Sequence, residues 1–317
     1  MRTFMHGAAV WGVASPRRPS RVAGVTMAGF RVRDLDTLRM VPHPAVTLLL
    51  EFGAGSAVLD SAAGQHRGSV VAGPGLGSGG AVQARGENVA CVQVRLSPVI
   101  ARAVLGTSPA DLDGAIVSLP DLWGREAARI RERLGDASSW QDRFALTDAL
   151  LARRYEEGPP VAPEVAWAWH RILAGRGLTR IDGLAAEVGW SRKRLWSRFR
   201  SQLGLPPKRA VSLVRFDHAA HRLVAGESAA RVAADGGYAD QSHLHRDVKA
   251  FTGATPAAVA DEPFLAVDDI AWPFRGIGAV DPPSGRPLGR PEGGVLRASC
   301  LPPGRASRRP FRRGRPL

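Results

Sequence analysis

One short pattern occurs twice in the second half of this chain, and it constrains the fold more than any other feature. The two copies cover residues 181–191 and 229–238. In each copy an aliphatic residue and two alanines lead to a glycine, which an aromatic residue follows. The two glycines, Gly189 and Gly237, are 48 positions apart. Such self-similarity indicates one architecture used twice. Each copy predicts a short helix, a tight turn at its glycine and a second helix.

The second helix of each copy is expected to bury one face. Its apolar side chains recur three or four residues apart, which is the repeat of an α-helix. These side chains are Leu195, Phe199 and Leu203 in the first copy, and Leu244, Val248 and Phe251 in the second. Ser191 stands just before the first of these helices and is a residue type that caps helix N-termini.

The opposite faces of these two helices are polar and basic. Cations and helix N-termini bind phosphate, and Arg and Gln pair bidentately with guanine and adenine in the major groove. The candidate DNA-binding residues are therefore Arg192, Lys193, Trp196, Ser197, Arg200, Gln241, Ser242, His243, Arg246 and Lys249. For one helix alone, a merely solvated basic face is an equally good interpretation. Two copies at a fixed spacing, each with a glycine turn and a basic face, favour a DNA-reading motif.

Residues 165–260 resemble the DNA-binding half of AraC/XylS-type transcription regulators. The matching segments keep the order and spacing of that family and cover about a third of the chain: residues 184–191, 195–200, 204–207, 215–219, 237–242 and 249–256. The resemblance implies a rigid connecting helix over residues 210–225 between the two units. It also implies base-reading positions at Lys193, Trp196, Ser197, Gln241, Ser242, His243 and Arg246. Val248 stands where the family usually has Phe, and Ala229 where it often has Ile, so the second unit is expected to pack less tightly.

The distribution of charge agrees with a polyanionic partner. The net charge is +14. Residues 164–260 carry 15 basic and 8 acidic side chains, and residues 275–317 carry 10 and 2. Residues 1–163 are nearly balanced, with 18 basic and 15 acidic side chains. The positive charge thus lies on the segment expected to read DNA and on the C-terminal tail.

The first half of the chain predicts a β-rich domain. Apolar runs over residues 46–52, 68–72 and 88–95 are separated by glycine-rich turns, which favours a small antiparallel β-sandwich or barrel. Helical spacing follows over residues 124–134 and 140–155. The expected fold class is α+β, with this β domain and its packed helices ahead of an all-α domain. By domain order alone, the resemblance implies a cupin-like domain that senses a ligand or dimerises. A small barrel holds one ligand or is filled by its own side chains, and both alternatives remain open.

The expected domain boundaries follow these changes in pattern. They are a loose leader over residues 1–26, a β-rich sensing or dimerisation domain over 27–157, a linker over 158–164, a DNA-binding domain over 165–261 and an extension over 262–317. Met27 is an alternative start of the protein. The tail is rich in Pro, Gly and Arg, and from about residue 275 it is expected to be disordered because it lacks apolar periodicity.

The sequence predicts neither secretion nor membrane insertion. Two cysteines argue against a disulfide framework, and the valines around Cys91 predict a buried thiol in a strand. The first 16 residues make a poor signal peptide, since Gly interrupts the apolar part. No apolar run approaches the length of a membrane helix. The expected location is the cytoplasm, in association with the nucleoid.

Catalytic, metal and cofactor sites are not expected either. His243 and His245 diverge around a helix, and His218 and His221 are expected to form a solvated pair rather than a zinc site. The glycine-rich stretch over residues 73–80 predicts a flexible loop rather than a phosphate-binding loop, because no helix start follows it. We therefore predict that the protein is not an enzyme.

These observations predict a sequence-specific DNA-binding transcription regulator with an N-terminal sensing or dimerisation domain. The alternative is a basic nucleic-acid-binding or architectural protein without ligand sensing. The candidate partners are double-stranded DNA, a small-molecule effector, RNA polymerase and a second copy of the chain. The effector and the operator sequence are not specified by the residues.

Overall fold

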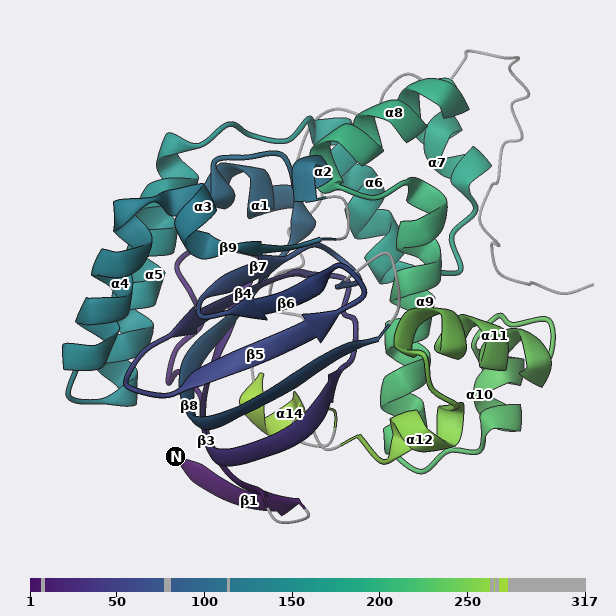
Figure 1. Ribbon diagram of the computed structural model, residues 1–317. Coiled ribbons are helices and arrows are strands. Elements are labelled where there is room, and N and C mark those ends of the chain that lie inside the picture. The colour runs from purple at the N-terminus through teal and green to yellow at the C-terminus, as the bar shows by residue number, and fades with distance from the viewer. Residues whose placement is uncertain (7–8, 77–80, 113–114, 263–264, 266–267, 273–317) are drawn as a thin grey trace, which may run out of the picture. The chain divides into compact units, whose positions relative to one another are not determined.

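The computed structural model describes residues 1–317 except residues 7–8, 77–80, 113–114, 263–264, 266–267 and 273–317. Its N-terminal part is an antiparallel sheet with packed helices, and the part that follows is helical (Figure 1). This confirms the expected α+β class. The strands are β1 Arg2–His6, β2 Ala9–Ala14, β3 Val25–Met40, β4 Val46–Glu51, β5 Ser56–Ser61, β6 Gly64–Arg67, β7 Val70–Ala72, β8 Val82–Leu96 and β9 Ile116–Ser118.

Two long strands, β3 and β8, form the centre of the sheet. They pair antiparallel from Val25 opposite Leu96 to Met40 opposite Val82, with an irregularity between Leu35 and Leu38. On its other edge, β8 pairs with β4 along one half and with β5 along the other half. The strand order is β1-β2-β3-β8-β4-β7-β9, with β5 and β6 off this path. Strand β8 therefore has neighbours on both edges. Its residues 89–96 are continuously buried because both faces of the sheet are covered there.

The two faces of the sheet belong to two different cores. Side chains alternate between the faces of a strand, so Val92 and Val94 of β8 face one core and Cys91 faces the other. The first face is covered by helices α1 Pro98–Leu105, α3 Leu119–Trp123, α4 Arg125–Asp136 and α5 Trp140–Glu157. A further short helix, α2 Pro109–Leu112, follows α1.

The second face, which we call the inner face, is lined by Trp11, Phe30, Val32, Leu59 and Cys91, among others. Its core also includes Trp272, which comes from the far end of the described chain. The prediction of a buried strand thiol at Cys91 is confirmed, and burial raises the pKa of that thiol well above its ordinary value. Cys300 lies outside the described residues.

Residues 1–26 are not the loose leader expected from the sequence. Strand β1 pairs with β2, and β2 pairs with β3 from Trp11 opposite Val32 to Ala14 opposite Gly29. Trp11 and Val13 are buried in the inner-face core. The sequence prediction was wrong because the apolar stretch that forms β2 is short and is interrupted by Gly12. Its pairing partner, β3, lies further along the chain.

The other expected elements of the first half are largely present. Residues 46–52 contain β4, residues 88–95 lie within β8, and the two predicted helices correspond to α4 and α5. Strand β3 was not predicted from the sequence, and its alternation of apolar and charged residues is interrupted between Leu35 and Leu38. The predicted glycine-rich loop lies partly, and the tail from residue 275 wholly, outside the described residues.

The second half is a helical domain with one core. Its helices are α6 Pro163–Ala174, α7 Ile181–Glu187, α8 Arg192–Leu203, α9 Pro207–Val224, α10 Ala229–Asp235, α11 Gln241–Thr252 and α12 Pro256–Ala260. Trp169, Phe199 and Phe216 are fully buried side chains at its centre. A last short helix, α14 Asp268–Ala271, follows and packs against β2 and β3 instead.

Candidate nucleic-acid interface and the buried polar network beside it

Each predicted helix–turn–helix unit is present. The turn between α7 and α8 contains Gly189 with φ of 67°, and the turn between α10 and α11 contains Gly237 with φ of 72°. Both lie in the left-handed region, which glycine adopts without strain. The following aromatic residue donates its backbone N–H to the carbonyl five residues earlier, from Trp190 to Ala185 and from Tyr238 to Ala233. The repeated sequence pattern thus encodes the same turn twice.

The two second helices are fixed in the same manner. The Ser191 side chain accepts a hydrogen bond from the backbone N–H of Arg194 at 3.2 Å, and Asp240 accepts one from His243 at 2.7 Å. Left-handed glycines end both helices, Gly204 at φ 83° and Gly253 at φ 70°. The predicted apolar stripes of both helices are buried.

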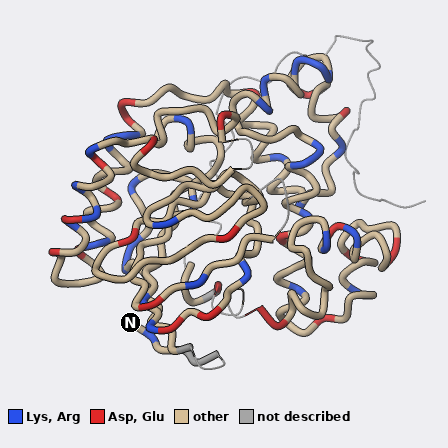
Figure 2. Tube along the Cα trace, in the orientation of Figure 1, with Lys and Arg blue, Asp and Glu red and all other residues tan. Residues whose placement is uncertain are grey.

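The candidate reading faces remain accessible. Nine of the ten candidate DNA-binding residues are exposed: Arg192, Lys193, Trp196, Ser197, Arg200, Gln241, Ser242, Arg246 and Lys249. His243 is half-buried. Figure 2 shows Lys and Arg gathered along α8. Trp196 is 47% exposed, so its ring is accessible to a partner.

Several of these residues already make contacts that shape the face. Arg192 pairs with Asp182 at 2.8 Å across the first unit. The Arg200 guanidinium lies 5.4 Å from the centre of the Trp196 ring. The Nδ1 atom of His243 accepts a hydrogen bond from the backbone N–H of Ala239 at 3.3 Å, so at most one ring nitrogen of His243 can meet a base.

Helix α9 joins the two units as a single rigid element. It has 18 residues, about 27 Å at the helical rise. Phe216 stacks on Phe251 of α11 with ring centres 4.8 Å apart. Arg215 also binds Asp247 of α11 at 2.7 Å. These contacts fix α11 on α9, in agreement with the predicted connecting helix.

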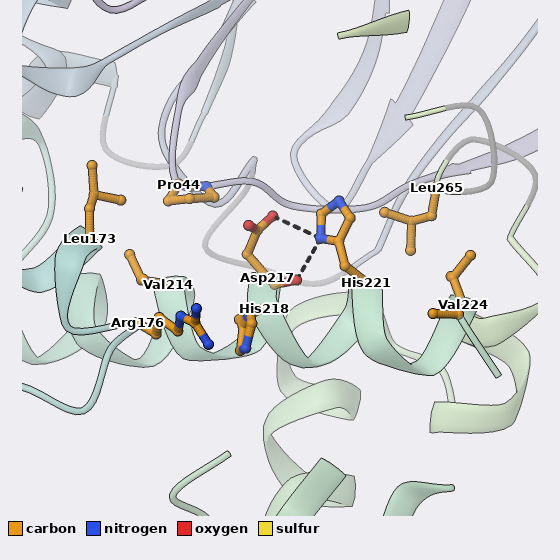
Figure 3. Close-up of a pocket in the computed structure, with 10 residues that line it drawn as sticks. Pro44, Leu173, Arg176, Val214, Asp217, His218, His221, Val224 and Leu265 are labelled. Carbon is orange, nitrogen blue, oxygen red and sulfur yellow. Dashed lines mark hydrogen bonds and ion pairs between the residues drawn. The ribbon is translucent and has the colours of Figure 1, made fainter. Parts of the chain in front are cut away.

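A pocket of about 650 Å³ lies along α9. Its apolar lining residues are Pro44, Leu173, Val214, Val224, Ala225 and Leu265, and its polar ones are Arg176, Asp217, His218 and His221 (Figure 3). This volume and this mixture of apolar walls with a few polar groups are typical of small-molecule sites. The pocket is therefore beside the connecting helix and not inside the sheet.

Behind the pocket lies a buried polar network that joins α9 to the sheet. His43 donates from Nδ1 to Asp217 at 2.7 Å and accepts at Nε2 from Arg95 at 2.6 Å. These partners require the neutral form of His43. Arg95 also donates a hydrogen bond from each Nη atom to the Asp268 carboxylate, at 2.8 and 3.2 Å. His221 donates from Nε2 to Asp268 at 2.8 Å and from Nδ1 to the Asp217 carbonyl, which requires the charged form.

The pKa values of the network agree with these protonation states. Burial lowers the pKa of His43, and the charge on Arg95 lowers it further. Burial also acts to lower the pKa of His221, but the hydrogen bond to Asp268 and the charge on Asp217 outweigh it and raise that pKa. Burial acts to raise the pKa of Asp268, yet the Arg95 charge and the His221 hydrogen bond hold it well below its ordinary value.

Residues 184–262 match a protein family described as a helix-turn-helix domain. The C-terminal part of this chain is a helix-turn-helix domain. The match confirms the resemblance to the DNA-binding half of AraC/XylS-type regulators over those residues. None of the curated protein sequences matches the chain.

Solved structures with a similar trace include ToxT from Vibrio cholerae, which is 12% identical at a TM-score of 0.43 and covers 76% of this chain and 98% of that one. The C-terminal domain of AraT from Geobacillus stearothermophilus is 19% identical at a TM-score of 0.30, covering 32% and 85%. The xylose-binding transcription activator XylR is 20% identical at a TM-score of 0.29, covering 38% of each chain. TM-scores below 0.5 are too low to extend the fold or the function of these proteins to this chain.

The sequence located the helix-turn-helix domain but missed the network beside it. His218 and His221 were expected to be a solvated pair, whereas His221 is hydrogen-bonded to Asp217 and Asp268. That prediction was wrong because Asp268 lies 47 residues further along the chain and beyond the helix-turn-helix pattern. The sequence feature that points to the region of Asp268 is the acidic stretch over residues 261–274, within an otherwise basic second half.

Among the described residues, no helix is long and apolar enough to cross a membrane. The same residues contain no cluster of three or more His, Cys, Asp or Glu side chains arranged to hold a metal ion.

Proposed function

We propose that this DNA-binding transcription regulator reads two successive major-groove segments of one duplex, one with α8 and one with α11. The supporting observation is that both helices present exposed polar and basic faces while α9 holds their units in a fixed relation. A recognition helix fits the major groove of B-DNA. Two such helices on one rigid scaffold fit grooves about 34 Å apart.

The ten exposed or half-exposed side chains divide into two roles under this proposal. Base edges are contacted by Lys193, Trp196 and Ser197 from α8, and by Gln241, Ser242, His243 and Arg246 from α11. Arg192, Arg200 and Lys249 contact phosphates, which adds affinity without sequence information. The Trp196 ring, with Arg200 beside it, packs on a thymine methyl or on the sugar–phosphate backbone.

The N-terminal part supplies regulation in this proposal. Residues 1–157, which include β1 and β2, form a sensing or dimerisation domain. Residues 158–164 link it to the DNA-binding domain over 165–261, and a small-molecule effector enters the pocket beside α9. RNA polymerase and a second copy of the chain are the further partners. The protein works in the cytoplasm on nucleoid DNA, without catalytic activity and without a cofactor.

Selection of DNA fragments retained by the purified protein tests this function. We expect an enriched sequence with two conserved blocks about one helical turn apart. Repeating the selection with Trp196→Ala should blur one block, and with Gln241→Ala the other. Arg133→Ala is the matched control, because it removes an exposed residue from α4. Retention without any enriched sequence would contradict the proposal and favour an architectural DNA-binding protein.

A further inference from the structure

The loop over residues 175–180, between α6 and α7, lies directly on the connecting helix α9. Gly177 in this loop has φ of 72°, and its backbone N–H donates to the carbonyl of Ile172 at the end of α6. A Cβ atom on Gly177 would lie 2.4 Å from the Val211 carbonyl oxygen and 2.6 Å from the Arg215 backbone nitrogen. Arg176, the residue before Gly177, lies beside α9 in Figure 3. Because glycine has no Cβ atom, the loop that leads into the first helix–turn–helix unit rests on the backbone of α9.

The same turn of α9 also holds the second unit. The Arg215 side chain binds Asp247 of α11 at 2.7 Å, and its guanidinium carbon lies 4.5 Å from the centre of the Tyr238 ring. Tyr238 lies edge-on to the ring of His243, a candidate base reader, with ring centres 5.3 Å apart. Arg215 therefore contacts the loop of the first unit through its backbone and the second unit through its side chain.

The two units also touch each other away from α9. Leu178 of the loop lies over Gly237 in the turn of the second unit, and a Cβ atom on Gly237 would lie 2.2 Å from Leu178 Cδ2. Contacts along a single helix fix the distance between two units but restrict rotation about the axis of that helix less well. A contact between the units themselves restricts this rotation. Leu178 is 54% exposed, so its removal would break the contact without opening a cavity in the core.

Double-stranded DNA requires a fixed relation between two reading helices. One base pair inserted between two segments moves the second segment by about 3.4 Å along the duplex and rotates it by about 34°. A rigid pair of units cannot follow this change unless the DNA is deformed, whereas a loosely joined pair follows it easily. The tightness of the contacts between the units therefore determines how strictly one spacing is selected.

We propose that Gly177, Leu178 and Arg215 form a junction that fixes the second unit relative to the first and so selects one spacing between the two DNA segments. They are positioning residues, because they lie outside the exposed faces of α8 and α11. The inference rests on the proposed reading of two segments by one chain. The reading helices select the sequence of each segment, and the junction selects the distance between the segments.

Double electron–electron resonance spectroscopy of the full-length protein tests the junction without DNA. Spin labels on Arg198→Cys of α8 and Ala250→Cys of α11, both exposed positions, report the distance between the reading helices. Cys300→Ser leaves the buried Cys91 as the remaining native thiol. We expect Leu178→Ala to widen the distance distribution at least about twofold, because the units then sample more orientations. Leu178→Met keeps an apolar side chain at the contact and should keep the narrow distribution.

Binding to the selected DNA site, with and without one base pair inserted between its two blocks, tests the spacing. The insertion should weaken binding of the wild-type protein by at least about tenfold. Leu178→Ala and Arg215→Met should each reduce this penalty to about threefold or less, while the sequence enriched in each block stays the same. Arg171→Met is the matched control, since it removes an ion pair with Glu187 between α6 and α7, and it should keep the full penalty.

Distance distributions of equal width in Leu178→Ala and in the unsubstituted labelled protein would overturn the proposal. An equal penalty for the inserted base pair in Leu178→Ala and in the wild type would overturn it as well. Selection without paired blocks would instead contradict the proposed reading of DNA, and the distance distributions would still decide whether the junction holds the two units together.

Discussion

At the scale of single residues, Arg246 is the side chain on α11 best suited to read guanine. It is exposed, and its Nε is only weakly engaged with the Ser242 carbonyl at 3.4 Å. We predict that Arg246→Ala lowers the discrimination between the preferred base pair and its alternatives by about 1–3 kcal/mol. Binding constants measured on the selected site and on its single-base variants check this value.

The same measurement on random DNA separates base reading from phosphate contact. Arg246→Ala should change affinity for random DNA far less than affinity for the selected site, and Arg133→Ala on α4 should change neither. An equal loss on both DNAs would show that Arg246 only neutralises phosphate.

The exposed residues of the reading helices could be predicted from the sequence, whereas the network residues could not. Helical periodicity assigns Leu195 to a buried face and Lys193 to an exposed one without knowledge of anything else in the fold. The partners of His43 and Arg95 lie 174 and 173 residues away in the chain. Only the tertiary fold brings such groups together, so no local sequence pattern predicts these contacts.

At the scale of secondary structure elements, β2 is a structural part of the inner face. We predict that Trp11→Ala destabilises the protein by about 3–5 kcal/mol, because it removes a buried ring from that core. Denaturant unfolding monitored by circular dichroism measures the loss. Val10→Ala is the matched control, since Val10 is the preceding residue of the same strand and is 45% exposed. Equal stability of the two variants would mean that β2 does not belong to the core.

Docking of the segment Asp268–Trp272 should depend on pH in both directions. His221 has a raised pKa, so its contribution is complete below its ordinary value of 6.5 and is lost as pH rises through the raised value. His43 has a lowered pKa, so its contribution is complete above 6.5 and is lost as pH falls through the lowered value. The groups that face these two rings are Asp217 and His218 of α9, Asp268 of α14 and Arg95 of β8.

We therefore predict that hydrogen–deuterium exchange of residues 268–272, corrected for intrinsic rates, is slowest near pH 6.5, the ordinary value for both histidines. His221→Gln should remove the change on the alkaline side and keep the change on the acidic side. A matched His218→Gln variant should keep both. A profile that is the same in His221→Gln and in the wild type would contradict the charged form of His221.

At the scale of the whole molecule, the C-terminal tail is expected to add affinity without specificity. Residues 275–317 contain ten Arg and two acidic residues, and phosphate contacts by Arg release counterions from DNA. Removing these residues should lower affinity for all DNA and flatten its dependence on salt. The sequence selected by the shortened protein should stay the same, and a changed selection would mean that the tail reads bases.

The two halves of the molecule differed in how far the sequence could predict them. The helical half is built from local signals, such as the caps Ser191 and Asp240 and the turn glycines, and its architecture could be predicted. The sheet depends on pairing between segments far apart, such as β3 with β8 and β2 with β3. Its strand order and the entry of Trp272 into its core could not be obtained from local patterns.

Hydroxyl-radical footprinting of the selected DNA site, with the number of bound chains measured by native mass spectrometry, tests the central claim most directly. We predict that one chain protects two major-groove segments about 34 Å apart on the same side of the duplex. Gln241→Ala combined with Arg246→Ala should weaken protection of one segment and leave the other in place. Protection of a single groove segment per chain would contradict the account.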